Sequence, residues 1–197
     1  MLYKFSTLLA RAILILGFDL KIRGRESIPP AGPFLLVANH ESNFDPPVLA
    51  AACPREIYFL AKEELFTVHP LLGIYLRKVN ALPLRRGRTD ISSVRSAVKV
   101  LKNDPLLVFP QGRRGVSLAE VKPGVGFLHR KTRVPVVAAA VKGTGQVLPR
   151  GAKMVRRGKI SVRFSPVGAL HPGDSAEEAA GKIMSRIIAL LDAPESV

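Results

Sequence analysis

Residues 39–47 read NHESNFDPP and place His40 five positions before Asp45, directly after the apolar run 33–38. These residue types suit proton removal from a weakly acidic group such as an alcohol. A neutral imidazole accepts a proton near pH 7, and a carboxylate on its other ring nitrogen fixes the tautomer and stabilises the imidazolium. The spacing equally fits a strand that ends at His40 and a helix capped by Asp45. From the pair alone, a general base with its orienting acid and ordinary turn chemistry both stay open.

The other residues with reactive side chains carry weaker signals. Ser42 lies beside His40 without a surrounding G-x-S-x-G elbow, so we expect a turn or capping hydroxyl. Cys53 is the single cysteine and lies in an apolar stretch, which predicts a buried hydrophobe and excludes an internal disulfide. The remaining histidines show no ligand spacing: His69, His129 and His171. We therefore predict no metal site.

Two arginine-glycine turns follow apolar runs, LPLRRGRTD at 82–90 and FPQGRRG at 109–115. Glycine allows a tight turn and a close approach of backbone amides to an anion. The guanidinium groups of Arg113 and Arg114 suit bidentate binding of phosphate. A single turn of this kind would be a solvated basic loop, but two at strand ends predict a phosphate-bearing substrate.

Strand-like and helix-like runs alternate along the chain. The predicted strands are residues 19–24, 33–39, 56–61, 79–84, 106–110, 134–141 and 159–167. The predicted helices are 45–53, 89–103, 124–132 and 175–191, and residues 62–78 are expected to contain short helical pieces. The first helix is predicted to have Asp45 as its cap and Pro46 as its first residue, and the last to have a capping box of Ser175 and Glu178. This alternation predicts an α/β fold with a mostly parallel sheet covered by helices on both faces. In such sheets ligands bind beyond the carboxyl ends of strands, where His40 and 109–115 are expected to lie.

Residues 1–18 predict a separate N-terminal helix ahead of a domain over 19–197. Apolar residues recur at helical spacing, while Lys4 and Arg11 interrupt the run that a membrane span of ~20 apolar residues would need. No small-residue cleavage site marks a secretory signal. The helix is expected either to lie amphipathically in a membrane interface or to pack on its own domain.

The 197-residue chain is strongly basic, with 30 Lys and Arg against 15 acidic residues, a formal charge of +15 and a mean hydropathy of +0.19. This balance predicts an acidic partner: nucleic acid, an anionic membrane surface, an acidic carrier protein or phosphorylated substrates. Residues 150–163 contain no acidic residue and are expected to bind lipid headgroups or a carrier protein, unless they are a solvated basic face. An aromatic content of 6% and the lack of a recognised binding signature argue against nucleic acid, which stays the alternative.

Four blocks of the sequence resemble the glycerolipid acyltransferases, the family of 1-acylglycerol-3-phosphate acyltransferase. NHESNFD resembles the family's N-H-x-x-x-x-D signature, and LPLRRG resembles its second block, G-A-I-P-V-D-R-G. FPQGRRG resembles the third block, F-P-E-G-T-R-S, and VPVVAAAVKGT at 134–144 resembles the fourth, V-P-I-V-P-V followed by glycine. The blocks stand in family order across about 33–144, which favours the catalytic reading of the first.

The resemblance implies a role for each matching position. His40 is the expected general base on the acceptor hydroxyl, and Asp45 is its orienting acid. The other implied residues bind the acceptor: Arg86, Gln111, Gly112, Arg113 and Arg114. Three positions depart from the family pattern, because Gln111 replaces Glu, Arg113 replaces Thr and Arg85 replaces Asp. All three changes make the acceptor pocket more positive and leave the identity of the acceptor open.

The implied activity moves a fatty acyl group from an acyl-CoA or acyl-carrier-protein thioester to lysophosphatidate or a related phosphate-bearing acceptor, forming phosphatidate. The resemblance implies no cofactor. It implies an anionic membrane surface as partner and a peripheral or monotopic position at the cytoplasmic face of the cell membrane. A non-catalytic lipid-binding relative, a transferase for a different acceptor and a thioesterase are the alternatives within the fold.

Overall fold

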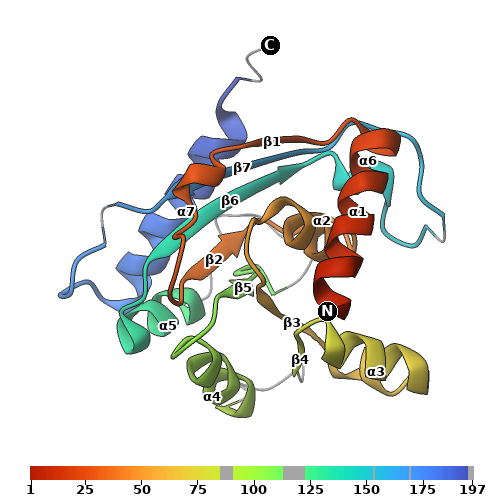
Figure 1. Ribbon diagram of the computed structural model, residues 1–197. Helices are drawn as coiled ribbons and strands as arrows, with labels where there is room; N and C mark the ends of the chain where they lie inside the picture. The colour runs from red at the N-terminus through yellow and green to blue at the C-terminus, as the bar shows by residue number, and fades with distance from the viewer. Residues whose placement is uncertain (85–90, 113–122, 153, 169, 195–197) are drawn as a thin grey trace.

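The computed structural model describes residues 1–84, 91–112, 123–152, 154–168 and 170–194, and its centre is one seven-stranded sheet (Figure 1). The strand order is β1-β7-β6-β2-β5-β3-β4. The strands are β1 (Lys21–Arg23), β2 (Leu35–Ala38), β3 (Tyr58–Lys62), β4 (Ala81–Leu84), β5 (Leu106–Val108), β6 (Val136–Lys142) and β7 (Ser161–Pro166). Neighbouring strands run parallel except β6 and β7, which are antiparallel. The predicted mostly parallel sheet is confirmed.

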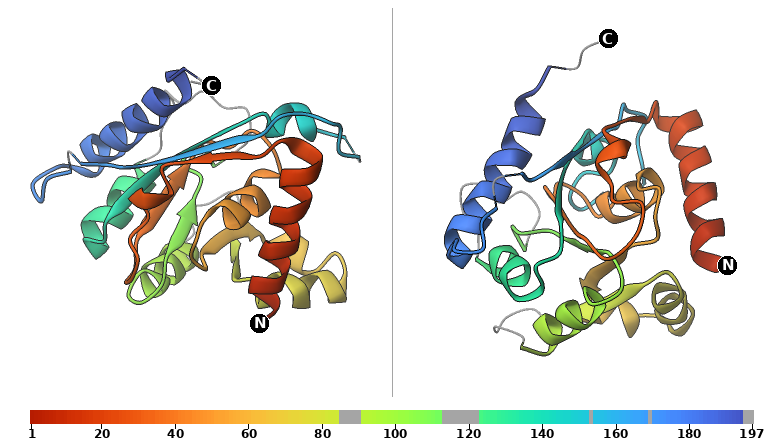
Figure 2. Two further views of the ribbon diagram at one scale, coloured as in Figure 1. Left: turned by 45° about the horizontal axis from the view of Figure 1, so that its top comes forward. Right: turned by 60° about the vertical axis from the view of Figure 1, so that its left-hand side comes forward.

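Helices cover both faces of this sheet, as the alternation of elements predicted. The α-helices are α1 (Leu2–Phe18), α2 (Asp45–Ala52), α3 (Pro70–Lys78), α4 (Ile91–Val100), α5 (Gly124–Thr132), α6 (Thr144–Val147) and α7 (Ala176–Asp192). Two 3₁₀ turns are η1 (Arg25–Ser27) and η2 (Glu63–Phe66). In the right-hand view of Figure 2, α4, α5 and α7 lie on one side of the sheet and α1 and α2 on the other, so the core forms two apolar layers.

Strand β2 shows why its sequence is apolar throughout. Leu36 and Ala38 belong to the layer under α1 and α2, while Leu35 and Val37 belong to the layer under α4, α5 and α7. All four side chains are fully buried. A strand buried on both faces has no solvent-facing position, so its sequence reads as a continuous apolar run.

Helix α7 begins where its sequence predicts. The Ser175 hydroxyl accepts from the Glu178 N–H at 3.1 Å, and the Glu178 carboxylate accepts from the Ser175 N–H at 2.7 Å, which completes the capping box. Buried Arg163 of β7 secures the other end by donating to the carbonyls of Ala193 and Pro194, each at 2.7 Å. The Ala193 carbonyl is at the C-cap of α7 and is one of those that a helix end leaves without an intrahelical partner.

Helix α2 begins one residue earlier than its sequence predicted. Phe44 holds the N-cap position, Asp45 is the first helical residue and Pro46 the second, so the assignment of Asp45 as cap is wrong. The Asp45 carboxylate instead points back to the preceding loop and accepts from the N–H groups of Glu41 and Ser42. This carboxylate therefore orders the loop in front of the helix.

Helix α1 packs on the domain along one line and leaves the rest of its apolar surface exposed. Tyr3, Leu14 and Phe18 are buried, and the Tyr3 hydroxyl accepts from the Ile57 N–H at 3.0 Å. Burial raises the pKa of the Tyr3 phenol. Its exposed large apolar residues are Leu2, Phe5, Leu8, Leu9, Ile13, Ile15 and Leu16. Among the residues described, no helix is both long and apolar enough to cross a membrane.

Candidate active site

Two parallel strand ends bring the first and third sequence blocks together. Strands β2 and β5 are neighbours with the register Leu35↔Leu106, so the residues after each strand meet at one edge of the sheet. The Gln111 side-chain oxygen accepts from the backbone N–H of His40 at 2.7 Å. Gln111 is 8% exposed, and Gly112 completes the turn after β5 with φ +62°. The turn closes through a bond from the Gly112 N–H to the Phe109 carbonyl at 3.1 Å.

The His40 ring lies against a fully buried carboxylate. Its Nδ1 is 2.7 Å from Asp45 Oδ2, and the same oxygen accepts from the N–H groups of Glu41 at 2.7 Å and Ser42 at 2.9 Å. Two backbone donors and the imidazole thus provide hydrogen-bond partners for this buried carboxylate oxygen. Stacking on Phe109, with ring centroids 4.2 Å apart, fixes the plane of the imidazole. The arrangement holds His40 by Nδ1 and leaves Nε2 as the nitrogen for proton transfer.

Further hydrogen bonds connect the loop of residues 39–45, which contains His40 and Asp45, to the end of β6 and to the residue that follows α6. The Asn39 side chain donates to the Val141 carbonyl and accepts from the Val141 N–H, both at 2.8 Å, and so links the two strands beyond their last backbone pair, Ala38 and Ala139. The Ser42 hydroxyl donates to the Leu148 carbonyl at 2.7 Å and accepts from the Phe44 N–H at 3.2 Å. The predicted turn role of Ser42 is confirmed.

Glu41 belongs to the same loop, and the charge of Asp45 affects the pKa of its carboxyl group. Desolvation by the surrounding protein raises the pKa of the Glu41 carboxyl, and the Asp45 carboxylate raises it further. The Gly145 N–H, which donates to Glu41, and the ammonium of Lys142 oppose this rise in pKa. The loop beside His40 therefore carries two carboxyl groups whose negative charges repel each other.

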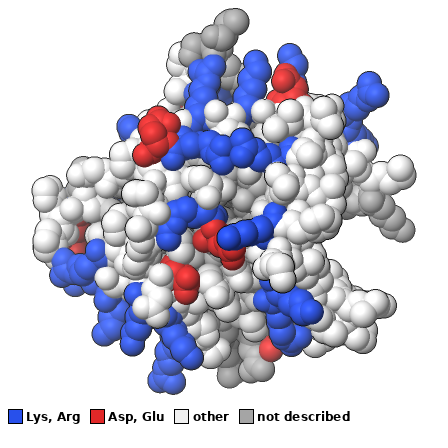
Figure 3. Space-filling model, in the orientation of Figure 1, with Lys and Arg blue, Asp and Glu red and all other residues white. Residues whose placement is uncertain are grey.

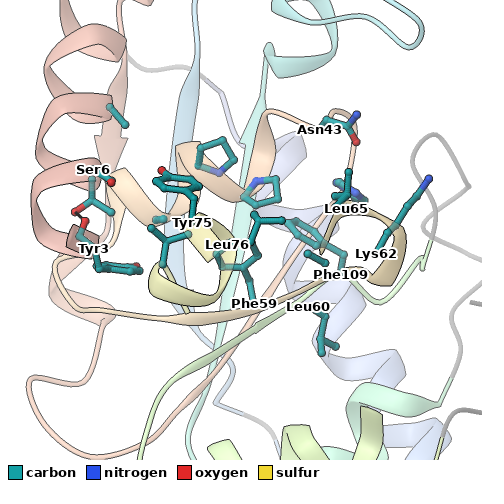
Figure 4. Close-up of a pocket in the computed structure, with 18 residues that line it drawn as sticks. Tyr3, Ser6, Asn43, Phe59, Leu60, Lys62, Leu65, Tyr75, Leu76 and Phe109 are labelled. Carbon is teal, nitrogen blue, oxygen red and sulfur yellow. Dashed lines mark hydrogen bonds between the residues drawn. The ribbon is translucent and has the colours of Figure 1, made fainter. Parts of the chain in front are cut away.

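A cavity of about 430 Å³ opens beside His40 and runs between α1, α2, α3 and β3 (Figure 4). Most of its walls are apolar or aromatic, with Phe59 and Leu60 from β3, Tyr75 and Leu76 from α3, and Phe109 after β5. Polar side chains on the walls include His40, Asn43, Lys62, Ser6 and Thr7. The cavity thus suits an alkyl chain whose reactive end reaches the imidazole.

The structure brings four of the sequence-predicted site residues together, His40, Asp45, Gln111 and Gly112. Arg86, Arg113 and Arg114 lie outside the residues that it describes. Sequence reasoning missed Lys62, which lines the cavity. Its position at the carboxyl end of β3, directly after the predicted strand 56–61, was the available signal, because ligands gather at such strand ends. Within the described ranges, no group of three or more His, Cys, Asp and Glu side chains has the arrangement of a metal site.

Comparisons with known proteins agree with this architecture. A family model described as Acyltransferase matches residues 19–142. The chain is 28% identical over 177 residues to a 1-acyl-sn-glycerol-3-phosphate acyltransferase of Bacillus subtilis, covering 89% of this chain and 85% of that protein. It is 31% identical to a lyso-ornithine lipid O-acyltransferase of Pseudomonas aeruginosa, covering 79% of this chain and 66% of the other. Several other curated relatives are longer, and the matched part covers 42–48% of their length.

A solved structure shares the fold over nearly the whole chain. The 1-acyl-sn-glycerophosphate acyltransferase PlsC from Thermotoga maritima matches with a TM-score of 0.79 and 24% identity, covering 99% of this chain and 81% of that one. The family model spans β1 through β6, and with them the loop of His40 and Asp45 and the turn of Gln111 and Gly112. The chain belongs to the acyltransferase family.

Proposed function

We propose that the protein transfers a fatty acyl group from a thioester to the hydroxyl of lysophosphatidate or a closely related phosphate-bearing lysolipid. The observation that carries this proposal is the His40–Asp45 pair at 2.7 Å beside an apolar cavity. A base alone would suit many reactions, and a cavity alone would suit many ligands. Together they match the needs of an alcohol that attacks a fatty acyl carbonyl. The relative from Bacillus subtilis supports the same acceptor class by its name.

In the proposed mechanism His40 acts as general base through Nε2. It removes the proton of the acceptor hydroxyl as the oxygen attacks the thioester carbonyl, and Asp45 stabilises the resulting imidazolium through Nδ1. The tetrahedral intermediate expels the thiolate, which takes the proton back from His40 and leaves as the free thiol. The products are the ester and the thiol. The transfer is direct, because neither Ser42 nor Cys53 has the environment of a nucleophile: both are buried, and Ser42 is engaged in the loop.

The cavity is the proposed site of the acyl chain, and the arginine-glycine turns are the proposed site of the acceptor phosphate. Lys62 lies on the cavity wall with His40 and is the described cation best placed for a phosphate or a developing negative charge there. Arg86, Arg113 and Arg114 keep the acceptor-binding roles that the sequence implied, with Gly112 shaping the turn. The Gln111 side chain meets the backbone of His40, so we assign it first to holding the base in place.

We further propose that the protein works peripherally at the cytoplasmic face of the cell membrane, with acyl-CoA or acyl-carrier protein as donor. Helix α1 exposes Phe5, Leu8 and Leu16 at 64%, 70% and 88%, and it borders the cavity. Figure 3 shows few charged side chains over α1, in contrast to the basic groups gathered along β1. Lysolipid acceptors dissolve in the bilayer, so an apolar helix at the cavity shortens their path to His40.

A second acceptor class is favoured by three substitutions and one relative. Gln111, Arg113 and Arg85 depart from the family pattern at acceptor-side positions. The Pseudomonas aeruginosa relative is named for a lyso-ornithine lipid. A transferase for a lysolipid other than lysophosphatidate is therefore the alternative function.

The test is the release of free thiol from palmitoyl-CoA, with and without acceptor, for the wild-type protein and His40→Ala. A carrier-protein thioester runs in parallel, and lysophosphatidate and a lyso-ornithine lipid serve as acceptors. We expect acceptor-dependent release that falls by about 10²–10⁴-fold in the variant. Release that does not depend on any acceptor would instead indicate a thioesterase. No release with either donor from folded protein would contradict the proposal.

A further inference from the structure

The loop between α6 and β7, residues 148–159, combines features that no step of acyl transfer uses. Its sequence LPRGAKMVRRGK has no acidic residue. At its tip Met154 is 81% exposed and Val155 is 50% exposed. The basic residues that the structure describes here are all exposed: Arg150, Arg156, Arg157 and Lys159. Within the described part of the chain, none of these four forms an ion pair.

The base of this 148–159 loop is closely fixed to the domain. The Arg156 N–H donates to the Val147 carbonyl at 2.8 Å, and the Ala152 N–H donates to the Pro149 carbonyl at 3.0 Å. Gly143 is in contact with the Lys159 carbonyl, which a side chain at this position would meet at 1.9 Å. Met154 and Val155 are thus exposed on a turn whose base is fixed by backbone hydrogen bonds.

The 148–159 loop ends beside the C-terminal end of α1. Directly after it, the Ile160 N–H donates to the Phe18 carbonyl at 3.1 Å, and the Lys21 N–H donates to the Ile160 carbonyl at 2.9 Å. The loop therefore leaves the domain beside the C-terminal end of α1. Figure 1 shows this loop beyond α6, near the C-terminal end of α1, while α3 lies toward the N-terminal end of α1.

Helix α3 also exposes large apolar side chains. Leu71 is 70% and Ile74 is 50% exposed, and Val68 just before the helix is 71% exposed. The cavity next to His40 is walled by α1 and α3. Helices α1 and α3 thus present exposed apolar side chains beside the cavity, and the loop with Met154 and Val155 follows at the C-terminal end of α1.

We propose that the 148–159 loop is a second membrane contact, in which Met154 and Val155 enter the headgroup region of an anionic bilayer while the flanking arginines and Lys159 bind lipid phosphates. This inference rests on the proposed function, since its substrates are membrane lipids. Exposed apolar residues between basic ones match the boundary between headgroups and acyl chains. An acidic carrier protein or a nucleic acid would neutralise the charges but would leave Met154 and the apolar surfaces of α1 and α3 in water. An anionic lipid surface accounts for both the basic residues and the exposed apolar residues.

A single tryptophan reports on the contact directly, because the chain contains none. Met154→Trp is titrated with phosphatidylcholine vesicles, with and without phosphatidylglycerol, and its emission is followed together with quenching by brominated lipid. We expect a blue shift and quenching with the anionic vesicles. Phe127→Trp on α5, at a position that is also exposed, is the control and should show neither. Unchanged emission of Met154→Trp on vesicles that bind the protein would overturn the proposal.

Charge reversal provides the second measurement. Arg156→Glu/Arg157→Glu should weaken binding to anionic vesicles by about tenfold or more, since each basic residue near such a surface adds about a factor of five. Arg130→Glu/Lys131→Glu makes the same change of charge at exposed positions of α5 and should bind more tightly than the loop variant. Equal weakening in both variants would mean that only net charge matters and would contradict a local contact. Melting temperatures confirm that each variant is folded.

The activity assay separates this inference from the proposed function. With acceptor and donor dispersed in neutral detergent micelles, the loop variant should retain wild-type activity, and on anionic vesicles its activity should fall with its binding. A wild-type protein that binds vesicles through Met154 but transfers no acyl group would defeat the proposed function and leave the membrane contact standing. An active protein whose loop variants behave as wild type on vesicles would defeat only the contact.

Discussion

At the scale of single residues, the position of His40 depends on contacts to both its side chain and its backbone. Asp45 holds the ring from one side, and Gln111 holds the backbone N–H from the other at 2.7 Å. The family pattern has Glu where this chain has Gln111. Either side chain offers an oxygen to the His40 N–H, so the exchange preserves the bond and removes a negative charge from the neighbourhood of Asp45.

Replacing Gln111 tests whether it positions the base or contacts the acceptor. Gln111→Leu leaves the His40 N–H without its acceptor, which destabilises a largely buried site by about 1–3 kcal/mol. We expect kcat to fall while KM for the acceptor changes little, because the ring is displaced but the acceptor pocket stays intact. Gln111→Glu keeps the hydrogen bond and should retain most of the activity. A Leu variant that raises KM for the acceptor with unchanged kcat would instead assign Gln111 to acceptor binding.

We expect Glu41 to make the stability of the protein depend on pH. Its pKa is raised in the folded state above the ordinary value of about 4.3, by desolvation and by Asp45. The folded protein therefore binds this proton more tightly than the unfolded chain does, and stability falls as the pH rises from below 4.3 through the raised pKa. Glu41→Gln has no such proton and can still accept from Gly145.

The expected result is that Glu41→Gln melts at a higher temperature than wild type at neutral pH, and that this difference shrinks as the pH falls toward 4. Thermal unfolding at pH 4 and pH 7.5 measures it. A difference that stays constant with pH would mean that the Glu41 carboxyl titrates alike in the folded and unfolded protein.

At the scale of elements, sequence patterns predicted most strands and helices because each pattern reflects local burial. Residues 124–132 and the capping box of Ser175 were predicted at the right positions. The start of α2 was one residue off, because the Asp45 side chain could equally bond forward into the helix or back into the loop. The short helix α6 was missed, since four residues carry no detectable helical period.

Two glycines in helices allow the effect of close helix packing on stability to be separated from that of intrinsic helix propensity. A side chain on Gly126 of α5 would lie 1.8 Å from the Ala176 carbonyl, so α5 and α7 approach closely only because this residue is glycine. Gly126→Ala should lower the free energy of unfolding by about 1–3 kcal/mol. Gly181 of α7 has nothing within 4 Å of the same position.

Gly181→Ala is the matched control and should raise the free energy of unfolding by up to about 1 kcal/mol, because alanine is the better helix former. Urea denaturation of both variants provides the comparison. Opposite signs support the close approach of α5 and α7, whereas a stabilising Gly126→Ala would show that the two helices separate without penalty.

At the scale of the whole molecule, the sequence could not predict the direction of β7 or the presence of the cavity. Residues 159–167 alternate in the same way whether the strand runs parallel or antiparallel to β6. The cavity is walled by α1, α2, α3, β3 and the end of β5, so its lining is dispersed from Tyr3 to Phe109. His40 and Gln111 were predictable as neighbours because both follow strand ends in a parallel sheet, but their hydrogen bond depends on which strands pair.

The cavity leads to a prediction about chain length that involves several elements at once. Ala50 of α2 is 7% exposed and lines the cavity, whose volume is about 430 Å³. Ala50→Leu adds three carbon atoms to a wall that α1 and α3 close from other sides, and these elements cannot retreat without exposing Tyr3 and Val79, which are now buried. The donor preference should therefore move toward shorter acyl chains, with KM rising for long donors and little change for short ones. A series of acyl-CoA donors of increasing length measures this, with Ala189→Leu on the exposed side of α7 as the control of equal volume. An unchanged length profile in Ala50→Leu, in a protein that still transfers acyl groups, would place the acyl chain outside this cavity.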